Sequence, residues 1–300
     1  MSSAPLVVLV AKRSQYQRHV RDRRDERAIE LLARHDPVVA RWRKADKAHQ
    51  QTLDQVQNEL ARLGTEIRLV TSPAERFTPR GAALVMTVGG DGTLLAASHR
   101  VGEQPLLGVN SSPEHSVGYF CAANSGNLRS LIARALDGTL QRLRLTRMNV
   151  IVNERLRSAR VLNEVLYTHS IPAAVSRYIL EFDGQREEQR SSGFWIGTAA
   201  GSTGAIRSAG GRVLSLASHQ LELVVREPYT PFGATLAMRR LIVAANAAVT
   251  VSTKMDRGVL FLDGPFRRIQ LRLGDVVRFT VSDESLTVLG LSARRRKLVL

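Results

Sequence analysis

The sequence contains little cysteine, and it has no long apolar run. Cys121 is the single cysteine among 300 residues, which excludes an intrachain disulfide framework and is typical of a reducing compartment. No stretch approaches the ~18 consecutive apolar residues that suggest a membrane span, and the first residues lack the order of a signal peptide. We therefore expect a cytoplasmic protein with no membrane partner.

Aromatic and acidic residues are also scarce. Aromatic side chains make up 5% of the chain and are not interleaved with basic residues, so we expect no base-stacking surface and no dedicated nucleic-acid partner. Lys and Arg number 43 against 27 acidic residues, and the net charge of +16 attracts polyanions, whether nucleotides, polyphosphate or nucleic acid. Without further cysteines or a histidine cluster, the sequence shows no zinc site.

The chain does contain enough apolar sequence for two domains. Apolar residues make up 44% of it, which is ordinary for a globular protein. Short apolar strands alternate with helices at first, which predicts a Rossmann-like, doubly wound α/β domain over residues 1–139. Residues 140–286 consist mostly of short alternating segments bounded by turns, which predicts a β-sandwich domain. The basic run near the end, 294–297, is either a solubilising tail or part of a segment that packs back on the first domain.

The hydrophobic pattern also predicts individual elements. The strands expected in the first domain are 6–10, 66–70, 84–88 and 104–109. The helices expected there are 38–63 and 124–136. The strands expected in the second domain are 141–146, 149–152, 161–167, 178–182, 221–226, 241–244, 248–253, 259–262, 269–273 and 276–281.

The most informative stretch is the glycine-rich loop that follows the apolar run 84–88. This loop consists of Gly89, Gly90, Asp91, Gly92 and Thr93, and an apolar helix start comes next. A strand, turn and helix in this order place the turn where open α/β sheets bind ligands, and free N–H groups at a helix start favour phosphate. The loop lacks the lysine of a P-loop and carries a carboxylate instead. Asp91 therefore either takes a proton from an attacking hydroxyl, faces a bound Mg²⁺, or belongs to an ordinary turn.

Asn163 and Glu164 form a second polar island, set among apolar residues. Burying such a pair costs free energy unless both side chains find partners. Glu164 can accept two hydrogen bonds from the hydroxyls of a ribose, and Asn163 can both donate and accept. A structural asparagine that bonds to a loop is an equally good interpretation.

A third island spans residues 191–211 and is rich in small residues and hydroxyls. Such a segment exposes backbone and short hydroxyls, which suits the close approach of a nucleotide. Residues 202–205 begin a short helix whose N–H groups could meet an anion. We favour a binding role for this segment because packing alone does not explain its composition.

The three islands together resemble the NAD kinase family. The motifs that carry the resemblance, in order, are 89–93, 163–164, 197–203 and 208–211. The sequence is most similar to the mitochondrial-type branch and its bacterial relatives, on the basis of 108–114, 162–165, 191–193, 226–228 and the long charged insert after the first strand. The resemblance covers nearly the whole chain.

This resemblance implies phosphorylation of the adenosine 2′-hydroxyl of NAD(H), with ATP or polyphosphate as donor and Mg²⁺ or another divalent cation. Asp91 would be the general base, and no protein side chain is implied as a fixed metal ligand beyond the Mg²⁺ that enters with the donor near Asp91. The donor phosphates would lie on Gly89, Gly90, Gly92 and Thr93. The dinucleotide would contact Asn110, Asn163, Glu164, Thr198, Ser202, Thr203, Ala205 and Ser208. Residues from about 287 to 300 would return to the first domain, and the protein would be a homodimer or homotetramer.

The sequence departs from the family pattern at Ala199, Ala200 and Ala205. The family commonly has proline and then Thr or Ser at the first two positions, and an aromatic residue near the third. Since base stacking on an aromatic ring contributes about 1–3 kcal/mol, the adenine-binding mode stays open.

Three other functions share some of these features. A lipid or sphingoid-base kinase shares the loop, but the chain has no apolar lipid-binding stretch. A phosphofructokinase would need a second substrate signature. A non-catalytic dinucleotide or polyanion sensor would keep the fold and lose the chemistry, which the retained Asp91 argues against.

Overall fold

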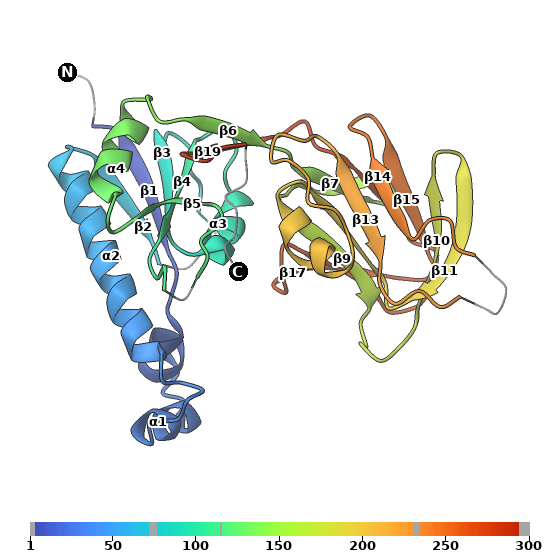
Figure 1. The fold of residues 1–300 in the computed structure, drawn as a ribbon, viewed down its shortest axis with the longest axis horizontal. Helices are drawn as coiled ribbons and strands as arrows, with labels where there is room; N and C mark the ends of the chain where they lie inside the picture. The colour runs from blue at the N-terminus through green and yellow to red at the C-terminus, as the bar shows by residue number, and fades with distance from the viewer. Residues whose placement is uncertain (1–3, 72–76, 115, 231–234, 294–300) are drawn as a thin grey trace. The chain divides into compact units, whose positions relative to one another are not determined.

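The computed structural model describes residues 4–71, 77–114, 116–230 and 235–293 (Figure 1). Contacts divide them into two units. The first unit runs to Leu143 and takes back Thr287–Leu291, and the second covers Arg144–Leu286. Of the segment 287–300 that we expected to return to the first domain, residues 294–300 lie outside the described part of the chain.

The first unit is built on a largely parallel sheet. Its strands are β1 (Leu6–Ala11), β2 (Glu66–Val70), β3 (Leu84–Gly89), β4 (Leu106–Asn110), β5 (Cys121–Asn124), β6 (Arg142–Leu145) and β19 (Leu286–Leu289). The order is β2-β1-β3-β4-β19-β6, and β5 also pairs with β4. β1, β3 and β4 are nearly or completely buried along their whole length, as the continuous apolar runs of parallel strands require.

Helices accompany this sheet. They are η1 (Gln17–Asp22), α1 (Glu26–Ala33), α2 (Trp42–Arg62), α3 (Asp91–Ser98) and α4 (Leu128–Leu136). α2, the long helix labelled beside β2 in Figure 1, packs against β2 and β3 and ends before Gly64, whose φ of 67° favours glycine. None of the helices among the described residues is long and apolar enough to cross a membrane.

Two helix starts differ from the sequence prediction. The helix expected from residue 38 begins at Trp42, because residues 37–41 form turns. The helix expected from residue 124 begins at Leu128. Asn124 ends β5 instead, and its side-chain Oδ1 accepts the Gly126 N–H at 2.9 Å, a local turn that competes with the helix.

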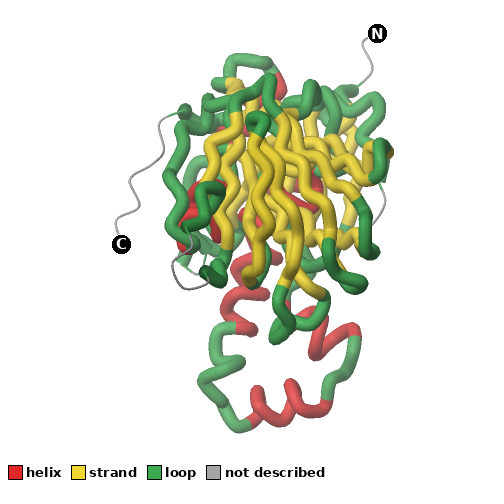
Figure 2. Tube along the Cα trace, turned by 90° about the vertical axis from the view of Figure 1, so that its right-hand side faces the viewer, coloured by secondary structure: helices red, strands yellow, loops and turns green. Residues whose placement is uncertain are grey.

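The second unit consists of two six-stranded antiparallel sheets, whose strands are drawn yellow in Figure 2. One has the order β11-β10-β15-β18-β7-β8 and the other β14-β13-β12-β9-β16-β17. The strands are β7 (Met148–Val152), β8 (Arg155–Val161), β9 (Glu164–His169), β10 (Ser176–Phe182), β11 (Gln185–Ser191), β12 (Phe194–Thr198), β13 (Leu221–Val225), β14 (Arg240–Val243), β15 (Ala248–Thr253), β16 (Gly258–Leu262), β17 (Arg267–Leu271) and β18 (Val276–Val281). The expected fold class, a doubly wound α/β domain with a β-sandwich, is confirmed.

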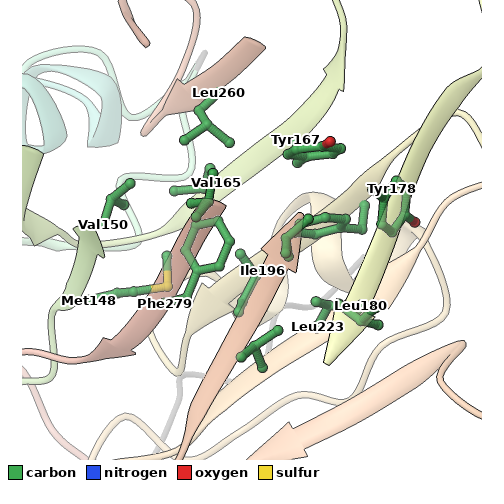
Figure 3. Packing of buried hydrophobic residues seen from close by; sticks show 14 of the residues in the cluster. Met148, Val150, Val165, Tyr167, Tyr178, Leu180, Ile196, Leu223, Leu260 and Phe279 are labelled. Atoms are coloured by element: carbon green, nitrogen blue, oxygen red, sulfur yellow. The ribbon is translucent and has the colours of Figure 1, made fainter. Parts of the chain in front are cut away.

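The core of the second unit joins the two sheets through aromatic rings. Tyr178 and Phe279 come from one sheet, and Tyr167 and Phe194 come from the other; three of them are labelled in Figure 3. The rings of Tyr167 and Phe194 stack with centroids 4.8 Å apart, and Tyr178 meets Phe194 edge-on at 5.3 Å. Each such pair adds roughly 0.5–1.5 kcal/mol to the stability gained from burial.

Candidate active site

The three glycines of the loop after β3 have different environments. A Cβ on Gly89 would collide with the Thr93 side chain, and a Cβ on Gly90 would lie 2.6 Å from the Ser116 Oγ. A Cβ on Gly92 would meet nothing within 4 Å, and this residue is exposed. The first two glycines therefore allow the backbone to pack tightly, whereas Gly92 leaves one side of the loop open to a ligand.

Asp91 is the first residue of α3, and its carboxylate is held by backbone. One oxygen accepts the Tyr119 N–H at 2.8 Å, and the other accepts the Phe120 N–H at 2.7 Å. These bonds tie the loop to the segment that leads into β5. Each carboxylate oxygen keeps a further lone pair, so the half-buried side chain can still accept a proton or face a cation.

Asn110 ends β4 and organises the loop that follows. Its Nδ2 donates to the Ser116 carbonyl at 2.8 Å, and its Oδ1 accepts the Ser112 N–H at 3.1 Å. The Ser111 N–H donates to the Gly89 carbonyl at 2.9 Å, which joins this loop to the glycine-rich one. The structure therefore gives the side chain of Asn110 a role within the loop, and its expected contact with the dinucleotide stays a prediction.

Asn163 and Glu164 lie where β8 passes into β9, and Asp263 holds their backbone. The Asp263 carboxylate accepts the N–H groups of Leu162 at 2.8 Å, Asn163 at 2.7 Å and Glu164 at 3.2 Å. The Asp263 N–H in turn donates to the Glu164 carbonyl at 3.0 Å. Asp263 could not be recognised as a site residue from the sequence, because an Asp-Gly pair looks like any turn and its partners lie far away in sequence.

The side chains of this pair are poised to accept hydrogen bonds. Asn163 Oδ1 and Glu164 Oε2 are buried and have no hydrogen-bond partner among the described residues. Burial, with the nearby Asp263 carboxylate, raises the pKa of Glu164 to about 7. Leaving a buried acceptor unpaired costs roughly 1–3 kcal/mol, so both atoms favour a ligand that brings hydroxyl donors.

Gly197 and Gly201 cradle the backbone of Asn163. A Cβ on either glycine would collide with the Asn163 carbonyl, which also accepts the Thr198 N–H at 2.9 Å. A Cβ on Gly204 would lie 3.7 Å from Glu164 Oε2. The glycine-rich motif 197–204 and the Asn163-Glu164 pair, which lie far apart in sequence, are therefore brought together as one site.

The hydroxyls expected in the dinucleotide pocket fall into two groups. Thr198 and Ser202 are fully buried. The Thr198 Oγ1 donates to the Leu162 carbonyl, and the Ser202 Oγ donates to the Ala199 carbonyl at 2.8 Å. These two side chains stabilise the loop itself.

The second group is more accessible. Thr203 precedes the short helix α5 (Ala205–Ser208), which Ala205 begins and the exposed Ser208 ends. Thr203 and Ala205 are half-buried, and the Ser208 hydroxyl donates to the Gly204 carbonyl at 3.3 Å. Ligand contact remains a prediction for the residues of both groups, which are Thr198, Ser202, Thr203, Ala205 and Ser208.

The chain matches the sequence models of two named domains. Residues 7–139 match the ATP-NAD kinase N-terminal domain, and residues 162–291 match the ATP-NAD kinase C-terminal domain. The chain belongs to the NAD kinase family. This finding confirms the expected family and the expected enzyme class, and no finding supports the lipid-kinase or sensor alternatives.

Relatives of known name agree with this membership. A probable NADH kinase of Oryza sativa subsp. japonica is 34% identical over 219 residues, which are 66% of this chain and 67% of the relative. An NADH kinase of Arabidopsis thaliana is 31% identical over 266 residues, covering 78% and 81%. An NAD kinase of Methanosarcina mazei is 28% identical over 250 residues, covering 77% and 82%.

Two solved structures share the fold. An NAD kinase from Archaeoglobus fulgidus in complex with ATP superposes with a TM-score of 0.69 at 20% identity, covering 98% of this chain and 96% of that one. Yeast NADH kinase complexed with NADH gives 0.66 at 17% identity, covering 98% and 85%.

Proposed function

We propose that this NAD kinase transfers the terminal phosphoryl group of ATP, or of another polyphosphate donor, to the adenosine 2′-hydroxyl of NAD or NADH. The observation that carries the proposal is the fixed position of Asp91. Its carboxylate sits at the carboxyl end of β3, on the loop with an exposed Gly92, and two backbone N–H groups hold it there. A base that is already oriented loses little freedom when substrate arrives.

In the proposed reaction Asp91 is the general base. The 2′-oxygen forms a bond to the terminal phosphorus while the bond from that phosphorus to the bridging oxygen of the donor breaks. Asp91 takes the hydroxyl proton, and when ATP is the donor the remaining ADP leaves. A secondary hydroxyl is a weak nucleophile at neutral pH, so a base within hydrogen-bond reach lowers the barrier.

Asn163 and Glu164 would bind the ribose hydroxyls. Their two orphaned oxygens, Asn163 Oδ1 and Glu164 Oε2, match the donors that a ribose offers. Asp263 fixes the backbone of both residues through its bonds to the N–H groups, so the acceptors are oriented before the dinucleotide binds.

Mg²⁺ would accompany the donor phosphates. Among the described residues no group of three or more His, Cys, Asp or Glu side chains could hold a metal ion. The free lone pairs of Asp91 fit the usual Mg²⁺ site, which combines one or two carboxylates with waters and substrate phosphates. Bound there, the cation would neutralise charge on the transferred group.

We further propose a cytoplasmic homodimer or homotetramer. The single cysteine supports a reducing compartment. Size-exclusion chromatography with light scattering would test the assembly, and a monomer at the concentration of the activity assay would contradict it.

The proposed function is tested by incubating the purified protein with Mg²⁺, ATP and NAD and identifying the product. We expect ADP and NADP in equal amounts, with the new phosphate on the 2′-oxygen by ³¹P NMR. NAD binding without NADP formation, with NADH and polyphosphate also tried, would favour the sensor. Phosphorylation of a sphingoid base instead of NAD would favour the lipid kinase.

A further inference from the structure

Lys12 follows β1 at the edge of the sheet that carries the glycine-rich loop. β1 and β3 are parallel, and Ala11 lies opposite Val88. The Lys12 N–H donates to the Val88 carbonyl at 3.1 Å, so its backbone lies beside the point where β3 runs into Gly89. A side chain here shares the sheet edge of the expected donor loop, at the carboxyl ends of the strands.

The Lys12 side chain is half-buried without an ionic partner in the described part of the chain. Burial lowers its pKa, which marks an ammonium that has lost part of its hydration. Its neighbour Arg13 shows the ordinary arrangement, because it is more exposed and pairs with Asp22 at 3.0 Å. An ammonium that has lost part of its hydration is stabilised by a nearby anion, and the described residues do not pair Lys12 with one.

Lys12 influences the pKa values of His49 and Cys121, and neither side chain provides that anion. Burial, helped by Lys12, lowers the pKa of His49 to about 4. The Cys121 thiol has a pKa raised to about 12, mainly by burial and then by Asp91, while Lys12 acts in the opposite direction. Both groups are therefore uncharged at neutral pH.

Asp46, whose carboxylate acts on His49, has partners of its own. It accepts the Ser14 hydroxyl at 2.6 Å and lies 3.5 Å from Arg21. Asp91, which acts on the same Cys121 thiol as Lys12, accepts two backbone N–H groups. Lys12 and Asp91 thus both act on the Cys121 thiol, and no ion pair joins the two among the residues that the structure describes.

We propose that Lys12 binds the phosphate chain of the phosphoryl donor and supplies the cation that the glycine-rich loop lacks. The inference rests on the proposed function, in which the donor lies on residues 89–93. A triphosphate placed beside Asp91 is repelled by that carboxylate, and an ammonium from the adjacent strand offsets the repulsion. The recognised class is a nucleoside or inorganic polyphosphate, since an ammonium reads charge and not the base.

The test compares Lys12→Met with Lys12→Arg and with Lys47→Met, which changes an exposed lysine of α2. Equilibrium binding of ATP and of inorganic tripolyphosphate is measured for each protein, together with the KM values for ATP and NAD. We expect Lys12→Met to weaken both polyphosphates at least about tenfold, because a charge-assisted contact is lost. The KM for NAD should change less than about twofold, because the substitution removes a contact to the phosphoryl donor and none to NAD.

The controls separate binding from folding. Lys12→Arg should recover most of the affinity, and Lys47→Met should behave as wild type. If Lys12→Met lowers the thermal midpoint, Lys12→Arg and Lys12→Gln replace it as the charged and neutral pair. Equal polyphosphate binding by that pair would overturn the inference, and so would a loss confined to ATP.

The same data distinguish this inference from the proposed function. A wild-type protein that binds ATP through Lys12 but forms no NADP would contradict the proposed function and leave the lysine site standing. A wild-type protein that forms NADP while every Lys12 variant keeps its affinity for ATP would contradict the lysine site alone.

Discussion

Asp91 and Glu164 both lie beside glycine-rich segments, but their carboxylates differ in the hydrogen-bond partners that the protein provides. Both oxygens of Asp91 accept backbone N–H groups at 2.7–2.8 Å. Glu164 Oε2 is buried and has no hydrogen-bond partner among the described residues, and burial raises the pKa of that side chain to about 7. The comparison teaches that the first acid is oriented by the protein before substrate arrives, whereas the second awaits donors from a ligand.

The largest effect should come from Asp91→Asn. We expect kcat to fall by about 10²–10⁴, the range that a general base contributes. NAD affinity should stay within about twofold, because the reaction's base does not anchor the dinucleotide. Steady-state kinetics of the variant beside Glu103→Gln, an exposed acid of the same unit, measures this.

Asp91→Asn also sets an amide NH₂ against one of the two backbone donors, so it has a structural cost. We expect a loss of about 1–3 kcal/mol of unfolding free energy. Denaturant unfolding under the assay conditions keeps the two effects apart. Turnover at the wild-type rate in a folded variant would rule out Asp91 as the base.

Glu164→Gln should have the next largest effect, and on binding instead of chemistry. Losing a charge-assisted hydrogen bond of about 1.5–3 kcal/mol predicts a KM for NAD raised about 10- to 100-fold. Stability should stay equal or rise, because the variant removes a buried carboxylate that the described residues leave unpaired. A KM for NAD that equals wild type would show that the orphaned oxygen is not a ligand contact.

Asp263→Asn should weaken NAD binding less strongly than Glu164→Gln. The amide can accept some of the three N–H bonds but turns its NH₂ toward another. We expect a KM increase of about tenfold, equivalent to one lost bond of about 1.4 kcal/mol. Asp183→Asn is the matched control. Asp183 also has a positive φ, of 51°, and also precedes a glycine, but it is exposed. Identical KM values for the two variants would contradict the positioning role.

The last expected effect is a dependence of stability on pH, which leaves substrate binding and chemistry aside. The folded pKa of Glu164 is about 7 against an ordinary 4.5, so the folded state binds the extra proton between these values. Stability from this group is therefore present at low pH and is lost as pH rises from about 4.5 to about 7. The unfolding free energy of wild type minus that of Glu164→Gln should therefore fall as pH rises from about 4.5 to about 7. A difference that stays constant over that range would contradict the raised pKa.

The sequence was informative wherever pattern and chemistry are local. The apolar run 84–88 and its glycines predicted a strand, a turn and a helix, and the structure has β3 ending at Gly89 and α3 beginning at Asp91. Two strands were missed because they are polar: β8 and β11 lie at sheet edges, where charged side chains are common. β12 was missed because its apolar start is short and lies within the segment 191–211, whose many small residues resembled a loop.

Partners that are distant in sequence could not be predicted. The N–H groups that hold Asp91 belong to Tyr119 and Phe120, and the carboxylate that holds Asn163 belongs to Asp263. Such bonds depend on how strands are ordered in the sheets. The sequence also could not show that the Thr198 and Ser202 hydroxyls donate to backbone carbonyls. A hydroxyl pattern looks the same whether it faces a ligand or the backbone.

The most direct test of the comparison measures NAD binding and NADP formation on the same preparations of Asp91→Asn and Glu164→Gln. The account predicts that Asp91→Asn binds NAD as wild type does and forms almost no NADP. It predicts that Glu164→Gln binds NAD weakly and turns over at a substantial rate once NAD is saturating. The reverse pattern, with binding lost at Asp91 and chemistry lost at Glu164, would contradict the roles assigned to these two carboxylates.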